Sequence, residues 1–350
     1  MIKKSQLLVA LLILGINISM AQTIDVVTGL SGNPNRLLLN GDDLYFTEQI
    51  SNKLSKIDLL SNPIVAEDII VGLDGPSSMV LNGNDLYITL FFANKISKID
   101  ISSNSPVLID VLTGLNQPNG MVLIGNELYF SESEPGSISK IDITDNSPIP
   151  EIVVTGFDFP SELALDGTDL YVSEISGDKI TKIDLSNNPP TVSEVITGIN
   201  GPIGIRVMGE ELYIAQYLEN KITKIDISVD FPTPIEVVAG LEGPTDIIFI
   251  GNDLYITENL GYKISKLENV ILGINDLSYK EIVLYPNPSS DFISLTNSIQ
   301  PIDYSIFNNI GMEISKGILI QNEKIDISHL NSGLYFLKFE NGNTLKFIKK

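Results

Sequence analysis

Short runs of apolar residues, separated by polar turns, follow one another along most of the chain. In one representative stretch, apolar residues fill Met79–Leu81, and the next run begins at Leu86 after the turn Asn82–Asp85. An Asn-Gly pair between two such runs is a strong signal for a tight β-hairpin. Further runs at Ile96–Asp100 and Leu108–Thr113 complete a unit of four short strands. The pattern predicts β-structure rather than helices, which would show a 3.6-residue period.

The four-strand unit occurs six times with a period of 42 residues. One proline, one glycine, one tyrosine and one lysine mark each unit at this spacing. The tyrosines are Tyr45, Tyr87, Tyr129, Tyr171, Tyr213 and Tyr255, and the prolines are Pro34, Pro76, Pro118, Pro160, Pro202 and Pro244. Repeats of about 40 to 50 residues with four strands each are typical of β-propellers. We therefore predict an all-β fold containing a six-bladed β-propeller.

The third strand of each unit supports this arrangement. Ile96 and Ile99 are three positions apart, so in an extended chain they point to opposite faces of the sheet. Both faces must then be covered by apolar neighbours, as they are in a propeller blade.

The two ends of the repeat region predict how the ring closes. The sixth unit lacks a fourth strand, because Gly273–Ser278 reads as a linker. Thr23–Leu30, at the front of the chain, closely matches the fourth-strand segment Leu108–Leu115. We expect this N-terminal segment to supply the missing outer strand of the sixth blade and so to remove an open sheet edge.

The first 21 residues predict a signal peptide. Lys3 and Lys4 precede an apolar stretch, Leu7–Ile18, and small residues at Ser19–Ala21 suit cleavage after Ala21. A transmembrane anchor would need about 20 apolar residues, and this run is shorter. No later segment is long and apolar enough to span a membrane.

Composition excludes several classes of function. The chain has no Cys and one His, so disulfides, thiolate chemistry and multi-His metal centres are excluded. Its formal charge is −22 and its pI is about 4.3. Nucleic acid and anionic membranes require a basic surface, so neither is an expected partner.

The repeat sequence resembles a known superfamily. The segments Gly251–Glu258 and Lys263–Leu267 are similar to NHL-type repeats and to those of the gluconolactonase/senescence-marker propellers. The resemblance covers residues 23 to about 268. WD repeats are excluded because the chain has no Trp.

The last 68 residues differ in sequence and in charge from the repeats. Val283–Leu295 contains Tyr-Pro-Asn-Pro, Leu330–Phe339 contains Gly-Leu-Tyr, and Lys346–Lys350 ends the chain in Lys-Lys. These residues resemble the C-terminal sorting domain of the type IX (Por) secretion system. The resemblance implies that the type IX secretion machinery is a partner and that the chain is exported. Alternating apolar and polar residues independently predict a small Ig-like β-sandwich.

Together these patterns predict four segments. They are a signal peptide at 1–21, a propeller at 22–268, a linker at 269–282 and a sorting domain at 283–350.

Candidate ligands recur at the end of the second strand of each unit. The residue three after the tyrosine is Glu48, Glu132, Glu174 and Glu258 in four units, and Leu90 and Gln216 in the others. Four carboxylates near a channel mouth could hold Ca²⁺, which prefers oxygen ligands. The alternative is structural: each Glu accepts backbone N–H groups or pairs with the lysine of the same loop.

The positions that break the repeat symmetry are more informative. Two residues after the prolines, at positions expected near the channel mouth, stand Arg36, Ser78, Gly120, Glu162, Gly204 and Asp246. The gluconolactonase resemblance implies a divalent metal held by a Glu, an Asn and an Asp near the channel, and Asn119, Glu162 and Asp246 are similar in type and location. Their order along the chain departs from that family.

We predict a secreted or cell-surface propeller that acts as a binding module. Its ligand is an extracellular protein, a glycan or a small molecule, which the sequence does not distinguish. Short loops of near-constant length favour binding over catalysis. The alternative is a Ca²⁺-dependent, gluconolactonase-like hydrolase, for which Ca²⁺ is the one cofactor required.

Overall fold

A computed structural model describes residues 22–270, 284–285, 287–295, 302–308, 312–319, 324–339 and 344–350. The predicted signal peptide and nearly all of the predicted linker lie outside these residues. The chain divides into two compact units, one on each side of the boundary between residues 271 and 272. All regular structure in the described residues is β-strand, which confirms the all-β prediction. None of the described segments forms a helix that could cross a membrane.

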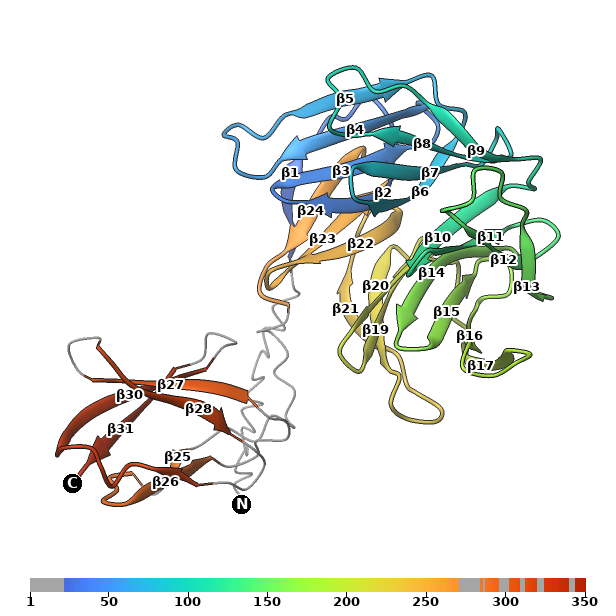
Figure 1. Ribbon diagram of the computed structural model, residues 1–350. Helices are drawn as coiled ribbons and strands as arrows, with labels where there is room; N and C mark the ends of the chain where they lie inside the picture. Colours follow the sequence, from blue (N-terminus) through green and yellow to red (C-terminus); the bar gives the residue numbers. More distant parts are fainter. Residues whose placement is uncertain are drawn as a thin grey trace, which may run out of the picture. The chain divides into compact units, whose positions relative to one another are not determined.

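The first unit contains repeated four-stranded antiparallel sheets (Figure 1), and all but the one with β1 are built from strands consecutive in the chain. The first strands are β2 (Pro34–Asn40), β6 (Pro76–Asn82), β10 (Pro118–Ile124), β14 (Pro160–Asp166), β18 (Pro202–Met208) and β22 (Pro244–Ile250). The second strands are β3 (Asp43–Glu48), β7 (Asp85–Leu90), β11 (Glu127–Glu132), β15 (Asp169–Glu174), β19 (Glu211–Gln216) and β23 (Asp253–Glu258). The third strands are β4 (Lys53–Asp58), β8 (Lys95–Asp100), β12 (Ser137–Asp142), β16 (Lys179–Asp184), β20 (Lys221–Asp226) and β24 (Lys263–Leu267). The outer strands are β5 (Ala66–Val71), β9 (Ile109–Thr113), β13 (Glu151–Thr155), β17 (Thr191–Thr197), β21 (Ile235–Ala239) and β1 (Ile24–Val27).

The sequence sets the register of each hairpin. Asn82 pairs with Asp85 across a two-residue turn, and Gly83 adopts φ of 62°, which glycine tolerates without steric cost. At the other end of the same strand pair, Pro76 lies opposite Leu90. The loop before each proline and the loop after each second strand therefore share one end of the sheet.

Neighbouring first strands contact one another in a closed cycle, in the order β2, β6, β10, β14, β18, β22 and back to β2. The apolar core lies between neighbouring sheets. Ile96 packs into the cluster between the second and third sheets, and Ile99 packs into the cluster between the first and second. The two faces of the third strand are therefore both covered, as the spacing of these residues predicted.

The N-terminal strand β1 completes the sheet that holds β22, β23 and β24. It pairs antiparallel with β24, where Ile24 lies opposite Lys266 and Val27 lies opposite Ile264. Val27 and Leu30 are buried in the cluster that joins this sheet to β2–β5. The first and last strands of the unit thus belong to one sheet.

The second unit has two small sheets that share one apolar cluster. One sheet contains β25 (Leu284–Tyr285), β26 (Phe292–Leu295) and β29 (Ile325–Asp326). The other has the order β28 (Glu313–Leu319), β27 (Ile302–Asn308), β30 (Gly333–Phe339), β31 (Thr344–Lys349). Ile293 from the first sheet and Phe347 from the second are both fully buried in the shared cluster.

Candidate functional site

A backbone irregularity places polar side chains at the centre of the ring. In each first strand the pairing register shifts just after the proline, so the next residues leave the ladder. Such bulges redirect side chains and leave backbone groups to be satisfied elsewhere. The Arg36 N–H, for example, donates to Thr47 Oγ1 at 3.1 Å, and that hydroxyl donates to the Ser77 carbonyl of the next sheet at 2.9 Å.

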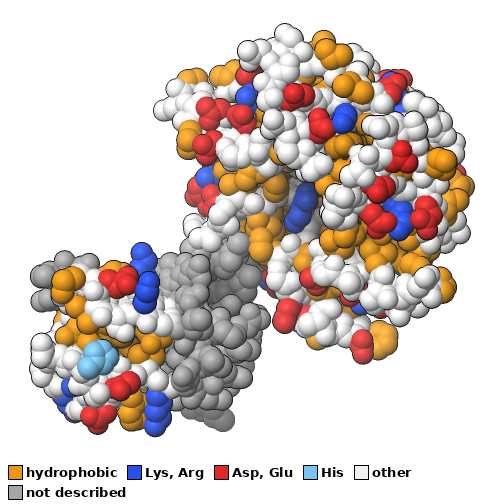
Figure 2. Space-filling model, viewed as in Figure 1, with side chains coloured by type: hydrophobic (Ala, Val, Ile, Leu, Met, Phe, Trp, Pro, Cys, Tyr) orange, Lys and Arg blue, Asp and Glu red, His pale blue; other side chains and the backbone are white. Residues whose placement is uncertain are grey.

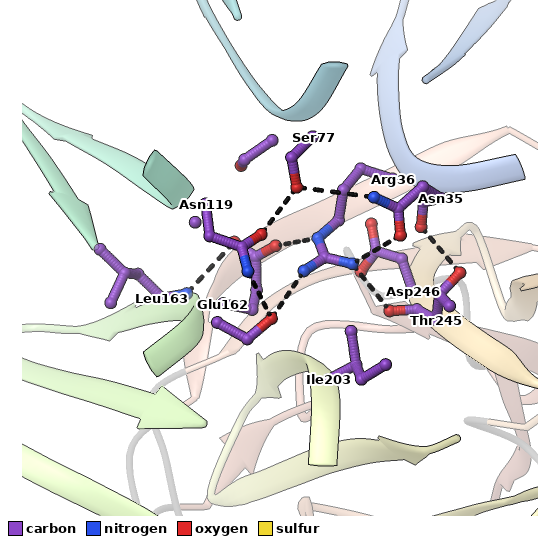
Figure 3. Close-up of polar contacts among 12 residues, drawn as sticks. Asn35, Arg36, Ser77, Asn119, Glu162, Leu163, Ile203, Thr245 and Asp246 are labelled. Carbon is purple, nitrogen blue, oxygen red and sulfur yellow. Dashed lines mark hydrogen bonds and ion pairs between the residues drawn. The ribbon is translucent and has the colours of Figure 1, made fainter. Parts of the chain in front are cut away.

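The residues directly after the prolines form what we call the central belt. Its members are Asn35, Ser77, Asn119, Ser161, Ile203 and Thr245. Asn35 Nδ2 lies 3.5 Å from Ser77 Oγ, which donates to Asn119 Oδ1 at 2.7 Å, and Asn119 Nδ2 donates to Ser161 Oγ at 3.3 Å (Figure 3). Hydrogen bonds between side chains therefore join the first four sheets. Ile203 interrupts the belt with an apolar side chain.

Four charged side chains sit beside the belt, and we call them the central cluster: Arg36, Glu162, Arg206 and Asp246. Arg36 Nε lies 2.5 Å from Glu162 Oε2, and the two side chains are only 3% and 6% exposed. Their sheets are three steps apart in the cyclic order, so this ion pair spans the centre of the ring. Burial raises the pKa of Glu162, and the Arg36 guanidinium opposes that rise.

The remaining donors of Arg36 are also used. Its guanidinium donates to Ser161 Oγ at 3.0 Å, to Asn35 Oδ1 at 3.2 Å and to the Thr245 carbonyl at 3.2 Å. One arginine thus contacts three sheets of the ring, counting its own. A buried guanidinium with four such hydrogen bonds fixes side-chain positions around it.

Asp246 joins the sixth sheet to both of its neighbours. Its Oδ2 accepts the Leu37 N–H at 2.8 Å, and its Oδ1 lies 3.4 Å from Arg206 Nη2. Arg206 Nε also donates to the Ile247 carbonyl at 3.2 Å. The Asp246 side chain is 1% exposed, whereas that of Arg206 is 36% exposed.

Two glycines make the close packing of the first strands possible. A Cβ atom on Gly120 would lie 2.2 Å from the Ser161 carbonyl oxygen, and one on Gly204 would lie 2.6 Å from the Thr245 carbonyl oxygen. A side chain at either position would force neighbouring first strands apart. These glycines therefore serve the close approach of backbones.

The three predicted metal ligands lie around the ring centre, but their oxygens are already engaged. Glu162 accepts from Arg36 and from the Leu163 N–H, Asp246 accepts as described above, and Asn119 Oδ1 accepts from Ser77. A guanidinium beside the carboxylate competes directly with a divalent cation for the same charge. These residues do not fit a Ca²⁺ site in this arrangement. The metal site stays a prediction that would require the Arg36–Glu162 pair to separate.

The predicted carboxylate ring at Glu48, Glu132, Glu174 and Glu258 does not come together. Each side chain is buried and accepts hydrogen bonds. Three accept a backbone N–H, as Glu174 does from Asp158 at 2.7 Å, and Glu48 accepts from Ser55 Oγ at 2.8 Å and pairs with Lys53. These contacts match the structural alternative. Within the described ranges, no three His, Cys, Asp or Glu side chains form a group that could hold a metal.

Sequence reasoning placed Arg36 near a channel mouth but missed its partner and missed Arg206. The available signal was the repeat offset. Arg36 and Glu162 occupy the same position three units apart, and opposite charges three steps apart in a ring of six face each other across it. Arg206 is the one charged residue at its repeat position, four after the proline.

Residues 283–350 match the family of secretion system C-terminal sorting domains. This match confirms the predicted sorting tail, and it indicates export through the type IX secretion system. No curated protein matches the chain.

Solved structures similar to the chain include several propeller proteins. A luciferin-regenerating enzyme has a TM-score of 0.59 at 12% identity, covering 72% of this chain and 96% of its own. An auxiliary nutrient binding protein from Bacteroides ovatus has a TM-score of 0.57 at 13% identity, covering 69% and 72%. A virginiamycin B lyase from Staphylococcus aureus has a TM-score of 0.51 at 18% identity, covering 78% and 95%. These likenesses confirm a propeller-like fold, and at such identities they concern the fold alone.

Proposed function

We propose that this protein is a six-bladed β-propeller, closed by its N-terminal strand, that works outside the cell as a binding module. The cyclic contacts of the first strands and the pairing of β1 with β24 support the six-bladed, closed arrangement. The shared core of the two small sheets supports an Ig-like sandwich for the tail. The sorting tail and the predicted signal peptide support a location at the cell surface or in the medium.

One observation favours binding over hydrolysis. Both carboxylates of the central cluster are engaged by its arginines and by backbone N–H groups, so neither is free to hold a metal or to act as a general base. Catalytic acids and bases must reach a substrate proton, and Lewis-acid catalysis needs open coordination positions. A cluster neutralised by its own arginines supplies neither. The similar solved structures include enzymes and a binding protein, so the fold does not decide between the two functions.

Calcium titration tests this proposal against the hydrolase alternative. We expect no binding heat when Ca²⁺ is titrated into the wild-type chain, and none with Glu162→Gln. Micromolar Ca²⁺ binding that Glu162→Gln abolishes, together with chelator-sensitive hydrolysis of a sugar lactone, would contradict the binding proposal. Asp85→Asn is the matched control, because this carboxylate belongs to a peripheral ion pair.

Deletion of the tail tests the proposed location. Removing residues 283–350 should leave the protein in the periplasm of its native host, because the sorting domain carries the export signal. Fractionation and surface proteolysis measure this. Undiminished surface display or secretion of the shortened chain would refute the export route.

A further inference from the structure

Beyond the central cluster, the middle of each first strand is mostly apolar, and three of the six strands end in an exposed polar residue, Asn40, Asn82 or Asp166. The residues four and five positions after each proline are Leu38 and Leu39, Val80 and Leu81, Val122 and Leu123, Ala164 and Leu165, Arg206 and Val207, and Ile248 and Phe249. All of them except Ala164 are partly exposed. Most of these side chains also pack against the apolar clusters between neighbouring sheets. Because the first strands contact one another in a closed cycle, we expect the exposed parts of these side chains to face the axial space. We call this region the far half of the channel.

Figure 2 shows a hollow in the middle of the first unit, where Figure 1 places β22. A Lys or Arg side chain lies in this hollow, with hydrophobic side chains around it. The first strands carry only two basic residues, Arg36 and Arg206. The Arg36 side chain is 3% exposed and the Arg206 side chain is 36% exposed. Of the two basic residues on the first strands, Arg206 is therefore the one that is exposed to solvent.

Arg206 retains unused hydrogen-bond donors. A guanidinium has five N–H groups, and those of Arg206 make two contacts with described residues, one to the Ile247 carbonyl and one to Asp246. The Asp246 contact is long, at 3.4 Å, and Asp246 also accepts the Leu37 N–H. In contrast to Arg36, Arg206 contacts the protein through part of its guanidinium and exposes the rest to solvent.

The sheet that carries Arg206 departs from the repeat at three further positions. Ile203 replaces the polar residue of the central belt, Ala215 replaces the hydroxyl that caps the bulge in the other sheets, and Gln216 replaces the glutamate of four other units. Each change removes a polar or charged side chain. In a repeat of otherwise similar units, concentrated departures in one unit mark the place where something other than the repeat itself is recognised.

We propose that the far half of the channel binds a small organic carboxylate that carries an aliphatic chain. The carboxylate would accept paired hydrogen bonds from the open edge of Arg206, a geometry that suits the planar guanidinium. The chain would lie against the leucine, valine and isoleucine side chains of the neighbouring first strands, where apolar burial supplies affinity. The inference rests on the proposed binding function and names its ligand class.

Other ligand classes fit this surface less well. Sugars need several hydrogen-bonding partners, whereas the middle of the first strands offers apolar side chains and one guanidinium, with Asn40, Asn82 and Asp166 only at the strand ends. A cation would meet the positive charge of Arg206. A polyanion would find a single cation, backed by the Asp246 carboxylate.

Calorimetric titration of the mature, full-length chain with octanoate tests the inference. We expect octanoate to bind, and octanamide, which has the same chain without the charge, to bind at least tenfold more weakly. Arg206→Gln should weaken octanoate binding at least tenfold, because a charge-assisted bidentate pair is lost. Arg206→Lys should bind octanoate more weakly than the wild type and more tightly than Arg206→Gln, since lysine keeps the charge but cannot donate the paired hydrogen bonds of a guanidinium. Thermal melting checks that each variant is folded.

A second substitution leaves Arg206 in place. Val80 lies on the sheet opposite that of Arg206, so Val80→Glu puts a competing carboxylate into the channel and should also weaken octanoate binding. The matched control is Val107→Glu, because Val107 is 70% exposed and lies outside the first strands. It should bind octanoate as the wild type does.

Three results would overturn the inference: no octanoate binding by the wild type, equal binding of octanoate and octanamide, or equal binding by the wild type and Arg206→Gln. None of them bears on the Ca²⁺ titration, which probes Glu162 and not Arg206. Failure of this ligand class is thus distinguishable from failure of the binding proposal.

Discussion

The buried ion pair between Arg36 and Glu162 should dominate the stability of the ring centre. Arg36→Met removes the guanidinium and leaves the Glu162 carboxylate, 6% exposed, with the Leu163 N–H as its remaining partner. Removing one member of a buried pair costs about 3–5 kcal/mol. For a unit of this size, each kcal/mol lowers the melting temperature by about 2–4 °C, so the expected loss is roughly 6–20 °C. Glu162→Gln should cost a similar amount, because it leaves the guanidinium uncompensated.

The double variant separates the free-energy cost of leaving one buried charge unpaired from the net contribution of the ion pair to stability. Arg36→Met with Glu162→Leu removes both charges and fills the space with apolar atoms. Such replacements of buried pairs are often neutral or stabilising. We therefore expect the double variant to be more stable than either single variant, with the deficit limited to the lost bonds of Arg36 to Ser161, to Asn35 and to the Thr245 carbonyl.

Differential scanning calorimetry of the mature chain measures these changes. The matched control is Lys98→Met, which breaks a 2.7 Å ion pair whose side chains are 29% and 40% exposed. Exposed pairs contribute at most about 1 kcal/mol, so its effect should be small. The reasoning is refuted if Arg36→Met costs no more than Lys98→Met, or if the double variant costs the sum of the two single ones.

Two further predictions concern the edge of the ring and its response to alkali. Deletion of residues 23–28 should lower the melting temperature of the first unit, because it removes the pairing of β1 with β24 and the burial of Val27. Burial of Val27 alone contributes about 1.5–3 kcal/mol to stability. An unchanged transition in calorimetry would show that β1 is dispensable. Burial raises the pKa of Tyr171 to about 12, so its contribution to stability is present below the ordinary phenol pKa of about 10 and is lost as the pH rises through the folded value. Denaturant unfolding at several alkaline pH values should show that the stability of Tyr171→Phe falls less than that of the wild type between these two pKa values, and equal losses would contradict the assignment.

The repeat made most of the fold predictable, because each landmark residue has a local mechanical role. The Asn-Gly pair at Asn82 fixes a hairpin, and the spacing of Ile96 and Ile99 requires cover on both faces. The first and last residues of the strands were harder to predict from the sequence. The apolar run Met79–Leu81 marks only the middle of β6, which begins three residues earlier at Pro76, because the residues after Pro76 are bulged and polar.

The candidate site was less predictable, because its geometry depends on the bulge after each proline. Sequence offsets place Arg36 and Glu162 at equal positions, but they do not say that both side chains turn toward the axis and meet. The glutamates after the tyrosines illustrate the converse error. Their repetition suggested a ring of metal ligands, yet each is buried and hydrogen-bonded, as Glu258 is by the Glu242 N–H.

A protein built from repeats carries its own internal comparison, because each position is sampled six times in nearly the same environment. Positions that stay the same in every unit serve the packing of the sheets. Examples are the lysines that pair with a carboxylate of the neighbouring strand, such as Lys98 with Asp85 and Lys224 with Glu211. Positions that vary at the ring centre fall into two groups, according to whether the protein itself occupies the hydrogen-bonding groups of the side chain. Arg36 differs from the residues at the same position of the other units, but its guanidinium donates hydrogen bonds to the protein itself. Its role is therefore to stabilise the closed ring. Arg206 differs and keeps donors open to solvent, which a role in stability alone does not require. That difference between two arginines is the physical reason to look for a ligand at the second.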